Sequence, residues 1–167
     1  MTGVQTCALP IYDLVGRKTA RDGGAVALAI AAQIEATEGV LAARSNVASR
    51  AMLKRLTAGR KAFLDAVAFV AGHSKAQPNA VFAGSVPYLM LAGTVVAGWQ
   101  MARALIAAED RLDNGTDGTD GIDADFMHAK IATAHFYADH ILNKAPGLRD
   151  SIVEGADSIT EMALDAF

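Results

Sequence analysis

Residues able to do chemistry are sparse in this chain, and the first candidate is the segment Gly16-Arg17-Lys18-Thr19. A phosphate-binding loop needs a glycine directly before the lysine and a second glycine five residues before that one. Arg17 and Tyr12 occupy those two positions. The segment is therefore interpreted as a charged helix end.

Aspartates gather between residues 113 and 125, around the polar stretch NGTDGTDGIDAD. An EF-hand calcium loop needs oxygen ligands at loop positions 1, 3, 5 and 12. Counted from Asp113, position 3 is Gly115 and position 12 is Ala124. The spacing of the aspartates does not match that of an EF-hand loop, so the stretch is interpreted as a solvated loop between two helices.

Two histidines share a predicted helix face, since His128 and His135 are seven residues apart and Asp139 follows His135 by four. Zinc sites use three or four ligands with supporting partners, and no glutamate lies between these histidines as in a metalloprotease. We expect a weak i,i+4 pair of His135 and Asp139. No set of nucleophile, base and acid emerges, so the chain is predicted to hold no catalytic, cofactor-binding or metal-binding residue.

Composition predicts an all-α protein. The 167 residues are 52% hydrophobic but only 6% aromatic, and alanine, the best helix former, is common. The net charge of −3 is mixed along the chain, which argues against a nucleic-acid partner. The single cysteine excludes a disulfide within the chain and fits a reducing cytoplasm.

Residues 1–11, MTGVQTCALPI, resemble the translation of a sequencing-library adapter that was read through into an open frame. We expect this segment to be an artefact and the natural sequence to begin near Tyr12, with an earlier part missing. A native N-terminal arm is the alternative. A secretory signal is not expected, because the segment has no basic region and its apolar stretch is short.

The remaining sequence predicts an antiparallel four-helix bundle with short extra helices. Residues 12–18 end a helix, 19–24 form a loop, and a helix from Ala25 carries an apolar face of Val26, Ile30, Ile34 and Leu41. Whether that helix stops at Gly39 or bends near Ser45 and Asn46 stays open. The next helix ends near Gly72 and has the apolar stripe Met52, Leu56, Phe63, Val67 and Val70.

A long helix is predicted from Ser85, as its cap, to about Asp113, with Pro87 in the first turn and Asn114 and Gly115 closing it. Asp123 is expected to cap the following helix, with Ile122 and Met127 as a hydrophobic staple. That helix presents the seam Met127, Ile131, Ala134, Ala138, Ile141 and Ala145. Pro146 and Gly147 kink or end it, a short helix covers 148–153, and a final turn follows Ser158.

No charged residue lies between Lys75 and Arg103, yet polar residues interrupt this stretch, so membrane spanning is not expected. Two other uses of the apolar surface stay open. One is a stand-alone interaction module that dimerises through Trp99, Phe136 and Tyr137. The other is peripheral membrane contact through residues 76–102.

Three segments resemble the acyl-CoA dehydrogenase family: YDLVGRK at 12–18, PYLMLAGTVVAGWQMARALIA at 87–107 and KIATAHFYADHIL at 130–142. The last two resemble the extra C-terminal helical domain of the subgroup that includes 3-methylmercaptopropionyl-CoA dehydrogenase. The resemblance divides the chain into the artefact 1–11, the end of a core helix and its loop at 12–24, and the C-terminal domain at 25–167.

The resemblance implies that the intact parent removes two hydrogens from an acyl-CoA, with FAD as cofactor and an electron-transfer flavoprotein as electron acceptor. In the family, a segment like YEGTNGIQ with the catalytic glutamate directly precedes YDLVGRK. That glutamate would fall near position 4, where this chain has Val4. The fragment is therefore expected to be inactive and to bind no FAD. It would instead pack on the rest of the dehydrogenase and form part of a cytoplasmic homo-oligomer.

Overall fold

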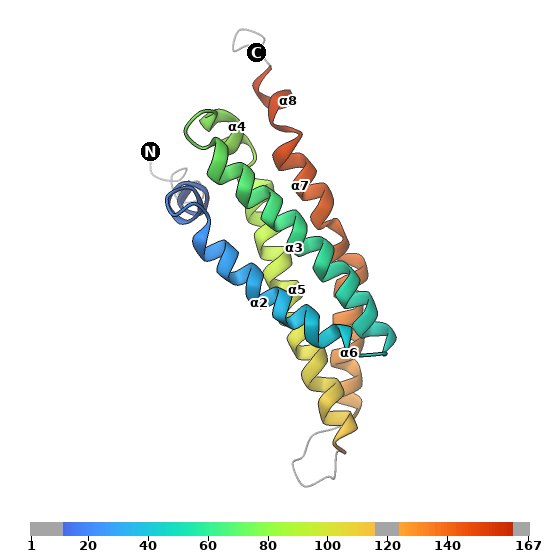
Figure 1. The fold of residues 1–167 in the computed structure, drawn as a ribbon. Coiled ribbons are helices and arrows are strands. Elements are labelled where there is room, and N and C mark those ends of the chain that lie inside the picture. The colour runs from blue at the N-terminus through green and yellow to red at the C-terminus, as the bar shows by residue number, and fades with distance from the viewer. Residues whose placement is uncertain (1–11, 116–123, 162–167) are drawn as a thin grey trace, which may run out of the picture.

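The computed structural model describes residues 12–115 and 124–161, and these are helical with short connections (Figure 1). The all-α prediction is confirmed. Along the chain the helices are η1 (Asp13–Ala20), α2 (Ala25–Ala42), α3 (Val47–His73), α4 (Pro78–Ala83), α5 (Ser85–Asp113), α6 (Ala124–His140), η2 (Leu142–Lys144), α7 (Ala145–Val153) and α8 (Ala156–Thr160). The predictions for residues 1–11, for the loop at 116–123 and for Ile122 and Asp123 concern residues outside the described ranges.

The long helices α2, α3, α5 and α6 alternate in direction along the chain (Figure 1). Helix α3 lies at the centre and contacts α2, α5, α6 and α7, while α5 contacts α2 on one side and α6 on the other. The short helices η1, α4 and α8 gather at one end, which we call the η1 end. We call the opposite end, where α2 turns into α3, the Arg44 end.

Helix α3 follows the sequence prediction closely. The predicted stripe Met52, Leu56, Phe63, Val67 and Val70 is buried throughout. The side chain of Asn46 accepts a hydrogen bond of 2.9 Å from the Ala48 N–H and so caps the helix. This cap resolves the open boundary, because α2 continues through Gly39 to Ala42 and the chain turns at residues 43–46.

The predicted apolar face of α2 is partly wrong. Ile34 and Leu41 are buried, but Val26 is 61% exposed, and the buried positions near it are Ala27 and Ala31. The helix is apolar on most of its circumference, so the choice of inner face depends on close approach to α3. Alanines permit that approach because their side chains are small.

Two boundary details also differ from the prediction. Ser85 is the first residue of α5 and does not cap it, since its hydroxyl donates to the Phe82 carbonyl oxygen at 2.6 Å. Pro78 opens the short helix α4 instead of lying in a linker, because proline suits the first turn of a helix. The predicted end of α5 is confirmed, with Gly115 in the left-handed region at φ 80°.

Helix α6 ends at His140, earlier than Pro146 suggests, because Ile141 leaves ideal helical geometry and the chain tightens into η2. The seam therefore shifts: Ala134, Ala138 and Ala145 are buried as predicted, but Leu142 replaces Ile141 in the core. Leu142 packs where α3 and α5 carry glycines. A Cβ atom on Gly98 would lie 2.9 Å from a Leu142 methyl carbon, and one on Gly59 would lie 3.2 Å from the other.

Candidate functional site

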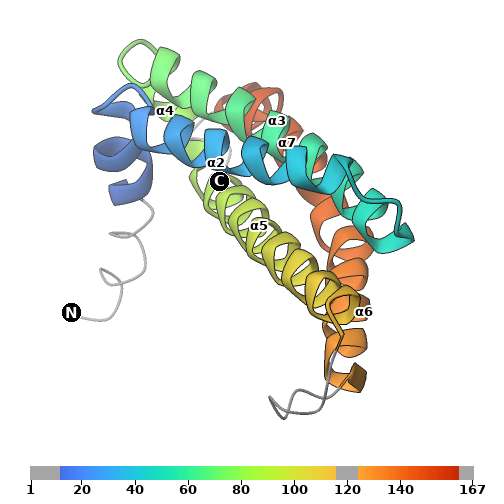
Figure 2. The same ribbon diagram turned by 60° about the horizontal axis from the view of Figure 1, so that its bottom comes forward.

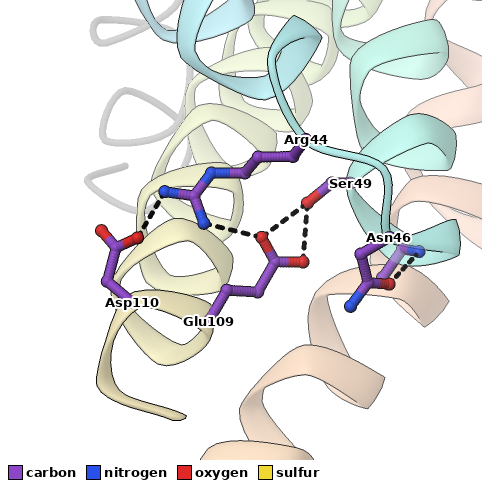
Figure 3. A network of polar contacts seen from close by, with 6 residues as sticks. Arg44, Asn46, Ser49, Glu109 and Asp110 are labelled. Atoms are coloured by element: carbon purple, nitrogen blue, oxygen red, sulfur yellow. Dashed lines mark hydrogen bonds and ion pairs between the residues drawn. The ribbon is translucent and has the colours of Figure 1, made fainter. Parts of the chain in front are cut away.

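The densest polar cluster lies at the Arg44 end and joins three helical segments (Figure 3). Ser49 of α3 donates to the Glu109 carboxylate, with oxygen separations of 2.7 and 2.9 Å. Arg44, from the turn after α2, donates to Glu109 Oε2 at 2.9 Å and to Asp110 Oδ1 at 2.5 Å. Glu109 is buried, with 8% of its side chain exposed. Hydrogen bonds to Asp110 and Glu109 raise the pKa of the Arg44 guanidinium, so it stays charged.

An open hollow of about 1000 Å³ borders this cluster. Its polar lining includes Arg44, Asn46, Asp110, Asp113 and His128. Three carboxylates, of Glu109, Asp110 and Asp113, line it, and the donors of Arg44 are already directed at the first two. The hollow therefore disfavours an anionic ligand by charge. Its arrangement indicates a bridge between helices and not a group poised for catalysis.

A second buried polar contact lies at the η1 end. The hydroxyl of Thr19 donates to the Leu14 carbonyl oxygen at 2.8 Å and lies 3.0 Å from the Tyr88 hydroxyl, which therefore acts as the donor to Thr19. Both side chains are at most 2% exposed. Burial raises the pKa of the Tyr88 phenol, which keeps it neutral. Thr19 thus connects η1 to α5 across 69 positions of sequence.

The GRKT segment is a charged helix end, as interpreted, with an additional structural role. Arg17 and Lys18 are exposed and pair with Asp13. The helix η1 has wide turns: the Arg21 N–H donates to the Gly16 oxygen at 3.1 Å and the Gly24 N–H to the Thr19 oxygen at 2.8 Å, each five residues earlier. Gly23 and Gly24 then adopt φ of 65° and 82°. Sequence patterns did not indicate Thr19 as a core residue.

Arginines join further pairs of helices. Arg60 of α3 forms a two-bond pair with the buried Glu38 of α2, at 2.8 and 2.9 Å. Arg55 of α3 reaches Asp139 of α6 at 3.6 Å, and Arg149 of α7 reaches Asp65 of α3 at 3.4 Å. No local sequence pattern predicts these contacts, because each joins residues of two separate helices.

The predicted pair of His135 and Asp139 is present, with the ring Nε2 3.2 Å from the carboxylate. His128 is exposed and lines the hollow at the Arg44 end. In the described ranges 12–115 and 124–161, no three residues among His, Cys, Asp and Glu gather closely enough to hold a metal ion.

The three aromatic residues of the interface hypothesis have different surroundings. Trp99 is half-buried and donates through Nε1 to the Thr37 hydroxyl of α2 at 2.8 Å. Tyr137 is half-buried and donates to the Thr94 carbonyl oxygen of α5 at 3.0 Å, and burial raises the pKa of its phenol. Phe136 is 59% exposed, and its ring lies 4.6 Å from that of His140 at an interplanar angle of 30°. Whether these residues dimerise the chain stays a prediction.

Two described helices, α2 and α5, are long and apolar enough to cross a membrane by length and composition. Because a core helix passes the same test, this observation alone does not indicate a membrane protein.

Comparison with known proteins gives the chain its family. The family model described as acetyl-CoA dehydrogenase C-terminal like matches residues 27–163. The chain is 37% identical over 159 residues to 3-methylmercaptopropionyl-CoA dehydrogenase of Ruegeria pomeroyi, covering 95% of this chain and 26% of that protein. It is 28% identical over 166 residues to the broad-specificity linear acyl-CoA dehydrogenase FadE5 of Mycobacterium tuberculosis, covering 97% of this chain and 27% of that protein.

The chain thus spans about a quarter of the length of each relative. Its matched segment includes every described helix from α3 to α8 and most of α2. The resemblance inferred from YDLVGRK and the two longer segments is therefore confirmed at the level of the family, and the chain belongs to the acyl-CoA dehydrogenase family as its C-terminal helical domain.

Proposed function

We propose that this chain is the C-terminal portion of an FAD-dependent acyl-CoA dehydrogenase, and that it supplies structure and not a reactive group. In this proposal the intact parent introduces a double bond between the α and β carbons of an acyl-CoA thioester. The parent is cytoplasmic and oligomeric, and it passes electrons to an electron-transfer flavoprotein. The similarity to two acyl-CoA dehydrogenases over almost the whole chain supports the parentage.

One observation supports the proposal that this chain has a structural role. Every buried polar or charged side chain of the described part, namely Thr19, Glu38, Ser49, Ser85 and Glu109, has a hydrogen-bond partner inside the chain. A catalytic acid or base must have an atom directed at its substrate. The buried carboxylates instead accept hydrogen bonds from Ser49 and from arginines, which hold helices together.

The large hollow at the Arg44 end also does not fit FAD. A flavin cofactor needs donors for its pyrophosphate, typically backbone N–H groups of a glycine-rich turn or free basic side chains. The large hollow at the Arg44 end is lined by Glu109, Asp110 and Asp113, and its arginine is paired. We therefore assign the cofactor, which supplies hydride acceptance when bound, to the remainder of the parent.

The division of the chain remains part of the proposal: residues 12–24 end a helix of the dehydrogenase core and 25–167 form the appended domain. The buried Val15 and Thr19 of η1 pack with the core of the later helices. In this proposal the core and the appended domain are therefore joined through a packed helix and not through a loose linker.

Absorbance spectroscopy tests the proposal. The purified 167-residue chain should show no flavin absorbance after incubation with FAD and no turnover of acyl-CoA. A hybrid that joins the remainder of the Ruegeria pomeroyi relative to residues 12–167 should hold flavin and turn over. Stoichiometric FAD on the chain alone, or a hybrid that folds and binds flavin without any turnover, would contradict the proposal.

A further inference from the structure

The outer surface of α2 and α5 is unusually apolar for a helix layer that faces solvent. Large apolar side chains exposed on both helices include Val26 by 61%, Val40 by 47%, Val86 by 55% and Leu89 by 40%. A helix that is apolar on its outer side as well as its inner side is typical of the interior of a larger protein. We call these four residues the groove face.

Val40 lines a groove between the two helices, and Val26, Val86 and Leu89 lie on the same sides of α2 and α5 nearer the start of each helix. Near the Arg44 end, Ala36, Thr37 and Val40 of α2 face Arg103, Ile106 and Ala107 of α5 across a groove of about 360 Å³. Residues seven apart lie on nearly the same face of a helix. Val26 is two such steps before Val40, and Leu89 is two such steps before Arg103. Helices α2 and α5 run in the same direction, so both stripes extend from this groove towards the η1 end (Figure 2).

The other side of the molecule is different. Helices α6 and α7 carry the paired charges His135 and Asp139, and Arg149 with Asp150 and Glu154. Phe126 and Phe136 are the large exposed apolar residues there among the described residues, and each lies beside a polar ring or ammonium group. The groove face is therefore a property of the α2 and α5 layer.

We propose that the groove face is the surface on which the dehydrogenase body packs, an inference that rests on the proposed function. The relatives are about four times as long as the matched segment, and the family model describes a C-terminal region, so most of each relative precedes it. The described chain starts at Tyr12, whose ring lies 5.0 Å from that of Phe82 in α4. The preceding body therefore arrives at the η1 end, where the groove face carries Val26, Val86 and Leu89.

Charge substitution with matched controls tests this proposal in the hybrid enzyme described above. V26E and V86E place a carboxylate in the groove face, while V47E and F136E do the same at residues of similar exposure elsewhere, 60% and 59%. Because all four side chains are exposed, each variant of the 167-residue chain alone should keep its melting temperature within about 2 °C.

In the hybrid, V26E and V86E should release the appended domain from the body. The rate of limited proteolysis at the junction should rise at least about tenfold, because a buried unpaired carboxylate opposes docking. V47E and F136E should change that rate by less than about twofold. Equal release by all four variants, or by none, would overturn the proposal.

Two competing occupants give different outcomes. If the chain alone forms a dimer in light scattering that V26E and V86E dissociate, the groove face binds a second copy. If the chain alone binds vesicles of phosphatidylcholine and phosphatidylglycerol and both variants abolish that binding, the face contacts lipid. Either result overturns the proposal. Flavin retention and turnover by the hybrid report on the proposed function separately, since they do not depend on which face docks.

Discussion

Two buried polar contacts, one near each end of helix α5, link this helix to the N-terminal part of the chain. The two contacts differ in chemistry. At the η1 end, the neutral hydroxyl of Tyr88 donates to the buried Thr19. At the Arg44 end, the buried carboxylate of Glu109 accepts from Ser49 and Arg44. A neutral buried contact can lose one partner at modest cost, whereas a buried charge cannot. The two ends should therefore respond differently to the same kind of substitution.

The largest expected effect is at the charged end. Arg44→Ala removes the cation and leaves Glu109 in a buried position with only Ser49 as donor. We expect the free energy of unfolding to fall by about 3 kcal/mol, measured by urea denaturation. Lys54→Ala, at an exposed position of α3, is the control and should change it by less than about 0.5 kcal/mol.

A substitution of Asp110, the exposed partner of Arg44, distinguishes the effect of losing an ion pair from the effect of leaving a charge buried. Asp110 is 52% exposed, so Asp110→Ala should lower the free energy of unfolding by less than about 1 kcal/mol, even though it too bonds Arg44. An equal loss for Asp110→Ala and Arg44→Ala would show that the bridge itself matters and not the burial of Glu109.

At the η1 end, steric fit should contribute more to the free energy of unfolding than charge does. Gly24 has φ 82°, and a Cβ atom there would lie 2.5 Å from a methyl carbon of Val67. Gly24→Ala should therefore lower the free energy of unfolding by about 2 kcal/mol, from backbone strain and overpacking together. Gly23 has φ 65° but nothing within 4 Å of the added carbon, so Gly23→Ala isolates the strain. Equal losses for both variants would exclude the packing contribution of Val67.

Removing the neutral contact should have a smaller effect. Tyr88→Phe deletes one hydroxyl, while Thr19 still donates to the Leu14 carbonyl oxygen, so no donor is left buried without a partner. The expected loss is about 1 kcal/mol in thermal or urea unfolding. A loss as large as that of Arg44→Ala would mean that the two ends do not differ in the way their chemistry indicates.

The sequence predicted the elements better than the contacts between them. The stripe of α3 was correct because large apolar residues recur on one side of a helix whose other side is charged, with Lys54 and Lys61 exposed. On α2 the same method chose Val26, because alanines on the true inner face give a weak signal beside valine and isoleucine. Composition cannot reveal that a helix face made of Ala27 and Ala31 allows closer packing.

The polar contacts between helices could not be predicted from the sequence for a different reason. Glu109 and Asp110 are adjacent acidic residues, yet one is buried and the other exposed. Their difference depends on Arg44, which lies 65 positions away from Glu109. Thr19 was likewise interpreted as part of a phosphate-loop pattern and as the start of a loop, although it lies in η1, since its partner Tyr88 lies 69 positions away. A helical period shows which side of a helix faces inward, but it does not identify the residue across the interface.

Titration gives the smallest and most specific test of the neutral end. Burial raises the pKa of Tyr88 above its ordinary value of 10.0, so the unfolded chain ionises this phenol at a lower pH than the folded chain does. The stability that Tyr88 contributes is therefore complete below pH 10 and is lost as pH rises through the folded-state pKa. At pH 10 the loss is about 0.4 kcal/mol, because half of the unfolded phenol is then ionised. Comparing wild type with Tyr88→Phe from pH 8 to 11 cancels the other titrating groups, and a constant difference over that range would show that the phenol is not held neutral by burial.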